Sequence, residues 1–245
     1  MYIIGVNNHY AANKFWKERL GSKPNGARVL GAAMEKYLAP IIERYYDAAI
    51  FYAADLITPE MLDRIPLDKK VFVAVHHNWP KEESFRCWQR VNVKLWGREV
   101  DYFCNEQFII DLIREGGGRA YYLPRFIDTS KYPKTNCTRT IDTLWLGNRW
   151  ACFEAEYQYY CQSVKKPLCI DGGWLWNGQT KIRPIKREQI PKILAQTKKV
   201  WAIGVSQLEA QFYGCDIISY RGGILPFYDE VSIQKYVKKL MEEIN

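Results

Sequence analysis

The sequence has few histidines, no paired cysteines and no long apolar run. Its 245 residues include three histidines and seven cysteines, and these form neither a Cys-x-x-Cys pair nor a cluster with zinc-site spacing. No stretch approaches the roughly 18 apolar residues that a membrane-spanning helix needs. The first residues also lack the basic and apolar regions of a signal peptide. We therefore expect a cytoplasmic protein with reduced, mostly buried thiols and no bound metal.

Positive charge is the main compositional signal. Lysine and arginine total 35 against 27 acidic residues, which gives a net charge of +8. Such a field attracts nucleic acid, an anionic membrane surface or a phosphorylated small ligand. The chain also carries nine tryptophans and 17 tyrosines, side chains that line grooves for sugars and bases as well as protein cores.

Strand and helix patterns alternate along the whole chain. Apolar runs typical of buried strands lie at 2–6, 47–55, 69–77, 100–105, 119–124, 141–148, 166–173, 199–204 and 215–220. Helical patterns lie at 27–45, 58–65, 84–95, 106–115, 153–164, 187–197, 206–213 and 230–244. Pro40 and Pro191 are expected to interrupt two of these helices. The alternation predicts an α/β protein with parallel sheets.

A polar, proline-containing stretch at 128–140 separates the two series of strands and helices. This change of composition is typical of a linker. We therefore predict two domains, residues 1–135 and 136–245, with the linker acting as a hinge between them.

The stretch GVSQLEAQFYGCDIISYRGG, residues 204–223, reads as a short helix between two strands. A helix that begins after a parallel strand offers free N–H groups to a phosphate, which makes Gly204, Val205 and Ser206 candidate ligands. Ser206 is also a candidate helix cap. Glu209 lies one turn further on, where its carboxylate would accept hydrogen bonds from a ribose diol. The alternative is that Glu209 is a solvent-exposed helix residue.

This stretch resembles the nucleotide-sugar-binding signature of GT-B glycosyltransferases, especially the retaining families with a Glu-x7-Glu motif. Glu209-Ala210, Gly214 and Gly222-Gly223 match the pattern. The resemblance implies a GT-B fold, in which two Rossmann-like parallel-sheet domains face each other across a cleft. It also implies that Glu209 binds the ribose. Trp201 stands where the motif has its first glutamate, so the stereochemistry of transfer stays open.

Weaker similarity extends over most of the chain and implies further site residues. On the donor side it points to Arg149 for the diphosphate, because arginine makes forked phosphate contacts, with Lys186 and Arg187 as further candidates. On the other side it implies catalytic roles for His76 or His77 and, if the enzyme inverts, for Asp55 as base. Asn7, Asn8 and His9 would shape the acceptor side.

The implied reaction moves a sugar from a nucleoside diphosphate donor, UDP-glucose, to an acceptor hydroxyl without metal or other cofactor. The short, basic, aromatic-rich chain resembles phage glucosyltransferases that modify hydroxymethylated pyrimidines, so double-stranded DNA is the expected partner and the host cytoplasm the expected location. One alternative is transfer to a cell-surface glycan or lipid-linked acceptor at an anionic membrane. A second is a non-catalytic domain that binds nucleotide or nucleic acid.

Overall fold

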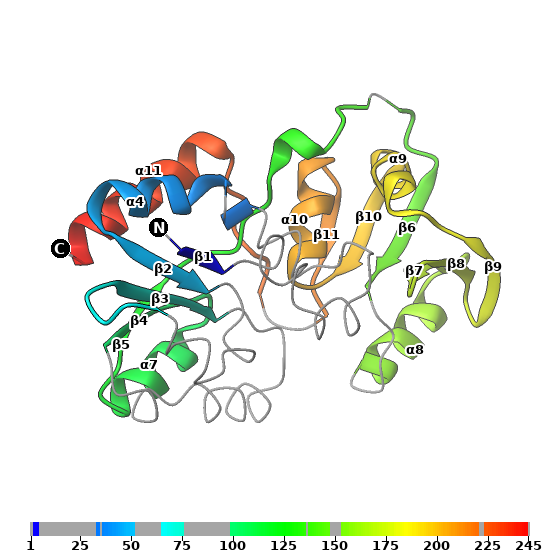
Figure 1. The fold of residues 1–245 in the computed structure, drawn as a ribbon. Coiled ribbons are helices and arrows are strands. Elements are labelled where there is room, and N and C mark those ends of the chain that lie inside the picture. Colours follow the sequence, from blue (N-terminus) through cyan, green and yellow to red (C-terminus); the bar gives the residue numbers. More distant parts are fainter. Residues whose placement is uncertain are drawn as a thin grey trace. The chain divides into compact units, whose positions relative to one another are not determined.

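The chain forms two compact units (Figure 1). The structure is a computed structural model that describes residues 2–4, 33–34, 36–51, 65–75, 99–135, 137–147, 153–220 and 223–244. The first unit comprises residues 1–128 and 228–245, and the second comprises residues 129–227. The division thus falls seven residues before the predicted boundary. The C-terminal helix also joins the first unit, not the second as predicted, because it packs against a helix of that unit.

The first unit is built on a parallel five-stranded sheet whose strands follow one another in sequence order. The strands are β1 (Tyr2–Ile4), β2 (Ala48–Phe51), β3 (Lys70–Val75), β4 (Val100–Cys104) and β5 (Arg119–Tyr122). Strands β2 and β4 are buried along their whole length. Continuous burial is the expected state of parallel strands that are covered on both faces.

Helices cover both faces of this sheet (Figure 1). One face carries α4 (Ala39–Tyr45) and α11 (Glu230–Ile244), and the other carries α7 (Gln107–Glu115). Pro40 lies in the first turn of α4, and the helical residues before it are separated from α4 at Leu38. The predicted interruption at Pro40 is therefore confirmed, because proline has no N–H to continue the helix.

The second unit contains a six-stranded sheet in the order β11-β10-β6-β7-β8-β9. Its strands are β6 (Ile141–Leu146), β7 (Leu168–Asp171), β8 (Trp174–Asn177), β9 (Thr180–Pro184), β10 (Thr197–Ala202) and β11 (Asp216–Ile218). All neighbours pair in parallel except β7 with β8 and β8 with β9. The α/β class with parallel sheets is as predicted.

The hairpin of β8 and β9 was not predicted. Asn177 pairs with Thr180 across a two-residue loop, and Gly178 adopts a φ of 55°. A loop of this kind needs glycine because the first central residue takes a positive φ. The glycine at 178, between the segments WLWN and TKIRP, was the sequence signal for this turn.

Three helices and a short 3-10 turn flank the second sheet. Helix α8 (Glu154–Ser163) packs on one face, against Trp145 and Cys169. Helices α9 (Ile190–Ala195) and α10 (Val205–Phe212) cover the opposite face. The 3-10 turn η5 (Arg187–Gln189) precedes α9, and Pro191 lies in the first turn of that helix. In the described part of the chain, no helix is long and apolar enough to cross a membrane.

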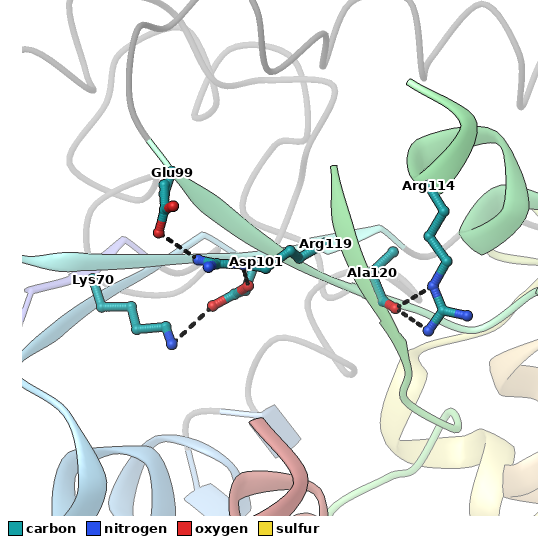
Figure 2. A network of polar contacts seen from close by, with 6 residues as sticks. All are labelled: Lys70, Glu99, Asp101, Arg114, Arg119 and Ala120. Atoms are coloured by element: carbon teal, nitrogen blue, oxygen red, sulfur yellow. Dashed lines mark hydrogen bonds and ion pairs between the residues drawn. The ribbon is translucent and has the colours of Figure 1, made fainter. Parts of the chain in front are cut away.

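A buried carboxylate on β4 organises the polar contacts of the first sheet (Figure 2). Asp101 is fully buried and lies 3.1 Å from Lys70 Nζ and 2.6 Å from Arg119 Nε. Arg119 also pairs with Glu99 at 2.9 Å. A buried charge requires compensation of this kind, so the network holds β3, β4 and β5 in register.

Removing both cations with Lys70→Met and Arg119→Met leaves Asp101 buried without a counter-ion. We expect the free energy of unfolding in urea to fall by about 3 kcal/mol, as when one side of a buried ion pair is removed. Lys198→Met is the control, because Lys198 and its partner Asp142 are both exposed; its urea midpoint should not change. Equal losses in the two proteins would contradict a special role for Asp101.

Three cysteines of the described chain, Cys104, Cys169 and Cys215, are buried, whereas Cys137 and Cys161 are partly exposed. Burial raises the pKa of Cys215 to about 11 and also raises the pKa of Cys104. Because the thiolate is the reactive form, native protein treated with iodoacetamide at pH 8 should be alkylated at Cys137 and Cys161 only, among these five. Mass spectrometry checks this, and urea should expose the other three. Rapid native labelling of Cys215 would be the contrary result.

Candidate functional site

The winding of the second sheet reverses between β6 and β10. From β6 the chain passes to β7 on one side, while β10 lies on the other side of β6. Helices also leave the two strands on opposite faces, with α8 after β6 and α10 after β10. The carboxyl ends of strands at such a reversal are where open α/β sheets bind ligands. The candidate site therefore lies at this edge of the second unit.

Helix α10 starts directly at this edge. Gly204, with φ 58° and ψ −137°, occupies its N-cap, and no side chain caps the helix. This backbone conformation suits glycine alone. Ser206 is the second residue of the helix, so its predicted capping role is wrong. Val205 and Ser206 are half-buried, and the first turn of α10 holds no acidic residue, so its own side chains place no negative charge at the positive end of the helix dipole.

Gln207 is the buried amide that holds this edge together, and sequence reasoning missed it. Its Nε2 donates to the carbonyl of Ala202 and to Ser219 Oγ, both at 3.0 Å. Its Oε1 accepts from the backbone N–H of Leu225 at 2.9 Å. Gln211, one turn later, donates to the Leu225 carbonyl at 2.8 Å. The sequence signal for this role was the pair of glutamines, Gln207 and Gln211, spaced i, i+4 so that they lie on one face of a short helix.

Glu209 is 2% exposed, so the alternative of a solvent-exposed helix residue is wrong. Its Oε1 accepts a hydrogen bond from the Tyr132 hydroxyl at 2.7 Å and forms an ion pair with Arg187 Nη2. Both of these contacts fall on one oxygen, and a carboxylate has about four acceptor positions. Oε2 therefore keeps acceptor capacity for a ligand hydroxyl.

Of the predicted phosphate ligands, Arg187 faces Glu209, whereas Lys186 is exposed. Burial lowers the pKa of Arg187, and the neighbouring Tyr132 and Glu188 act against that change. Arginine nevertheless stays charged in proteins. The structure thus joins two of the predicted site residues, Arg187 and Glu209, to each other.

Two residues of the predicted linker, one on each side of a three-residue turn, form side-chain hydrogen bonds. Asp128, at the end of the first unit, accepts from Lys36 Nζ at 2.8 Å and from the Tyr37 hydroxyl at 2.9 Å. Tyr132, in the second unit, is held by Glu209. Between them lies η3 (Thr129–Lys131), which belongs to the predicted linker 128–140.

Buried polar residues also gather at the carboxyl edge of the first sheet. Asn105 directly follows β4, and Arg125 follows β5 and is 4% exposed. Burial lowers the pKa of Arg125 to about 10, against the opposing effect of Glu106. Burial raises the pKa of the Glu106 carboxyl. These residues were not predicted as site residues, because charged side chains next to apolar runs are usually exposed.

Several predicted site residues lie outside the described residues: Asn7, Asn8, His9, Asp55, His76, His77 and Arg149. Within the described ranges, no group of three or more His, Cys, Asp or Glu side chains is arranged to hold a metal ion. No protein-family model matches the chain, and a search of curated proteins finds no match.

The strength of the Glu209 pair can be measured with a double-mutant cycle. Arg187→Met leaves a buried carboxylate with only the Tyr132 hydroxyl, and we expect it to lower the free energy of unfolding by about 3 kcal/mol. Adding Glu209→Met should recover part of that loss, with a coupling energy of about 1 kcal/mol or more in urea denaturation. Strictly additive losses would show that the two side chains do not interact.

Proposed function

We propose that this chain is a GT-B glycosyltransferase that transfers glucose from UDP-glucose to a hydroxyl on a modified base of DNA. One observation carries the proposal. The stretch that resembles the nucleotide-sugar signature forms α10 and the strand after it, at the carboxyl edge of a sheet that reverses its winding between β6 and β10. This is the edge where a nucleotide binds in open α/β sheets.

The groups at this edge suit a nucleoside diphosphate. The backbone N–H groups of Gly204, Val205 and Ser206 belong to the start of α10, and helix N-termini bind phosphate through such groups. Glu209, held by Arg187 and Tyr132 on Oε1, offers Oε2 to a ribose hydroxyl. Arg149 follows β6 in the sequence and is our proposed diphosphate ligand, with Lys186 as a further cation.

In the proposed reaction the acceptor oxygen forms a bond to the anomeric carbon while the bond from that carbon to the diphosphate breaks. The acceptor proton passes to a base, and negative charge develops on the leaving diphosphate. Arg149 and the amides at the start of α10 meet that charge. His76 or His77 orients the acceptor hydroxyl, and Asp55 takes its proton if the configuration inverts.

The DNA acceptor is proposed from the net charge of +8, since phosphate contacts supply most of the affinity of such enzymes for DNA. The same charge suits an anionic membrane that carries a lipid-linked acceptor. A transfer assay separates the two: UDP-glucose is incubated with hydroxymethylated DNA, with unmodified DNA, or with a lipid-linked glycan, and mass spectrometry locates the added hexose.

The donor site is tested by thermal unfolding with UDP, GDP, ADP and UDP-glucose. A ligand that binds only the folded chain at about 100 times its Kd stabilises it by about 2.7 kcal/mol, so UDP and UDP-glucose should raise Tm. Glu209→Gln should reduce that rise, measured from the variant's own unliganded Tm, because it replaces one carboxylate oxygen by an NH2 group and leaves an uncharged, weaker acceptor for the ribose.

Glu188→Gln is the matched control, because Glu188 is an exposed neighbour of Arg187. It should keep the full nucleotide shift. If no nucleotide raises Tm in the wild-type chain, the donor site is absent and the glycosyltransferase proposal fails. The non-catalytic alternative would then be supported by DNA binding that does not depend on a nucleotide sugar.

A further inference from the structure

The hairpin of β8 and β9 forms one edge of the second sheet (Figure 1). All five residues of β9, Thr180–Pro184, are exposed. At the loop of the hairpin, the Gly178 N–H donates to the Pro167 carbonyl at 2.8 Å. At its open end, the Ile185 N–H donates to the Gly173 carbonyl, also at 2.8 Å. Hydrogen bonds thus fix the hairpin at both ends.

Cations dominate this edge of the sheet. Residues 164–186 include five of them and a single acid, Asp171. The five cations are all exposed: Lys165, Lys166, Lys181, Arg183 and Lys186. Among the ion pairs between described residues, none involves any of the five. Because the first two directly precede Pro167, which accepts from the hairpin loop, cations lie both at the loop and along the strand. We call these five residues the basic edge.

Lys181 is held by aromatic rings instead of a carboxylate. Its Nζ lies 4.9 Å from the ring centroid of Trp174 and 5.2 Å from that of Trp176. Both tryptophans are half-buried on β8, and Trp176 is the residue that pairs with Lys181 across the hairpin. The face of a ring attracts an ammonium group but does not neutralise its charge as a carboxylate would. The two rings thus position a cation that can still bind an anion.

Charged residues on an edge strand also prevent pairing with a strand of another molecule. Lys181 and Pro184 on β9 suffice for that purpose, whereas Lys165, Lys166 and Lys186 lie outside the strand and cannot protect it. A surface that carries charge only for solubility has both signs interspersed. The excess of one sign at this edge therefore indicates a negatively charged partner.

The composition of the edge favours nucleic acid over an anionic membrane. Segments that bind a membrane surface insert apolar and aromatic side chains next to their cations. Within residues 172–186, Ile182 is the only large apolar side chain that is exposed, and the two tryptophans contact Lys181. A DNA duplex presents rows of phosphates, which lysine and arginine contact without any apolar insertion.

We propose that the basic edge binds the phosphate backbone of double-stranded DNA, with Lys181 and Arg183 as its central contacts. The inference rests on the proposed function for the choice of DNA as the polyanion, and it deepens that function by naming a surface that holds the acceptor. Two residues after β9 the chain enters η5, whose Arg187 pairs with Glu209. The second unit therefore carries both the proposed DNA surface and the proposed donor groups.

The full chain is tested by fluorescence anisotropy with an unmodified duplex of about 20 base pairs, because phosphate contacts carry no sequence information. Each phosphate contact contributes about 0.9 to the slope of log K against log salt concentration. Lys181→Gln combined with Arg183→Gln should lower the steepness of that slope by about 2. At low salt the same variant should bind about tenfold more weakly, since two charge-assisted contacts are lost.

Lys235→Gln combined with Lys238→Gln is the matched control. Both lysines are exposed on α11, and the net charge falls by the same two units as in the hairpin variant. The control should keep the salt slope of the wild-type chain. Equal losses in the two variants would show that affinity follows net charge alone and would overturn the proposal, as would a wild-type chain that binds no duplex at low salt.

Cosedimentation with vesicles of phosphatidylserine and phosphatidylcholine tests the membrane as the partner. A hairpin variant that loses vesicle binding and keeps duplex binding would refute the DNA surface. Failure of the proposed function gives a different result, in which no nucleotide raises the Tm of the wild-type chain while duplex binding still depends on Lys181 and Arg183. If UDP raises Tm but the hairpin variant binds duplex like the wild type, only the proposal for the basic edge fails.

Discussion

The second unit is organised around one buried negative charge. Glu209 is 2% exposed and sits on α10, and a carboxylate at that depth is stable only with charged and hydrogen-bonding partners. Arg187 comes from η5 and Tyr132 from the segment that enters the unit. The need to compensate one carboxylate therefore ties three separate parts of the chain together, next to the edge where we propose that a nucleotide binds.

Gln207 completes this arrangement from the same helix. A buried amide must satisfy both its donor and its acceptor groups, and Gln207 does so with the end of β10, Ser219 and the segment at Leu225. Short helix α10 thus combines N–H groups at its start, which suit a phosphate, with a buried amide that holds the end of β10 and the segment after β11.

The sequence predicted the regular elements well, because apolar periodicity is a local signal. The parallel strands at 100–104, 141–146 and 197–202 and the helix at 205–212 lie close to the expected positions. Patterns in the sequence could not predict contacts between distant segments. We predicted from them that the C-terminal helix belongs to the second unit, but the apolar face of this helix packs on α4, some 190 residues earlier in the chain.

The amino-acid sequence by itself determined the α/β class, the alternation of strands and helices, the basic charge and the prediction that Glu209 is a site residue. Only the tertiary structure decided what surrounds each side chain. Tyr132 and Arg187 lie 77 and 22 positions from Glu209, and Gln207 of α10 contacts Ser219, which follows β11. Burial and pairing arise when the sheet brings such positions together, and no local pattern of residues encodes those distances.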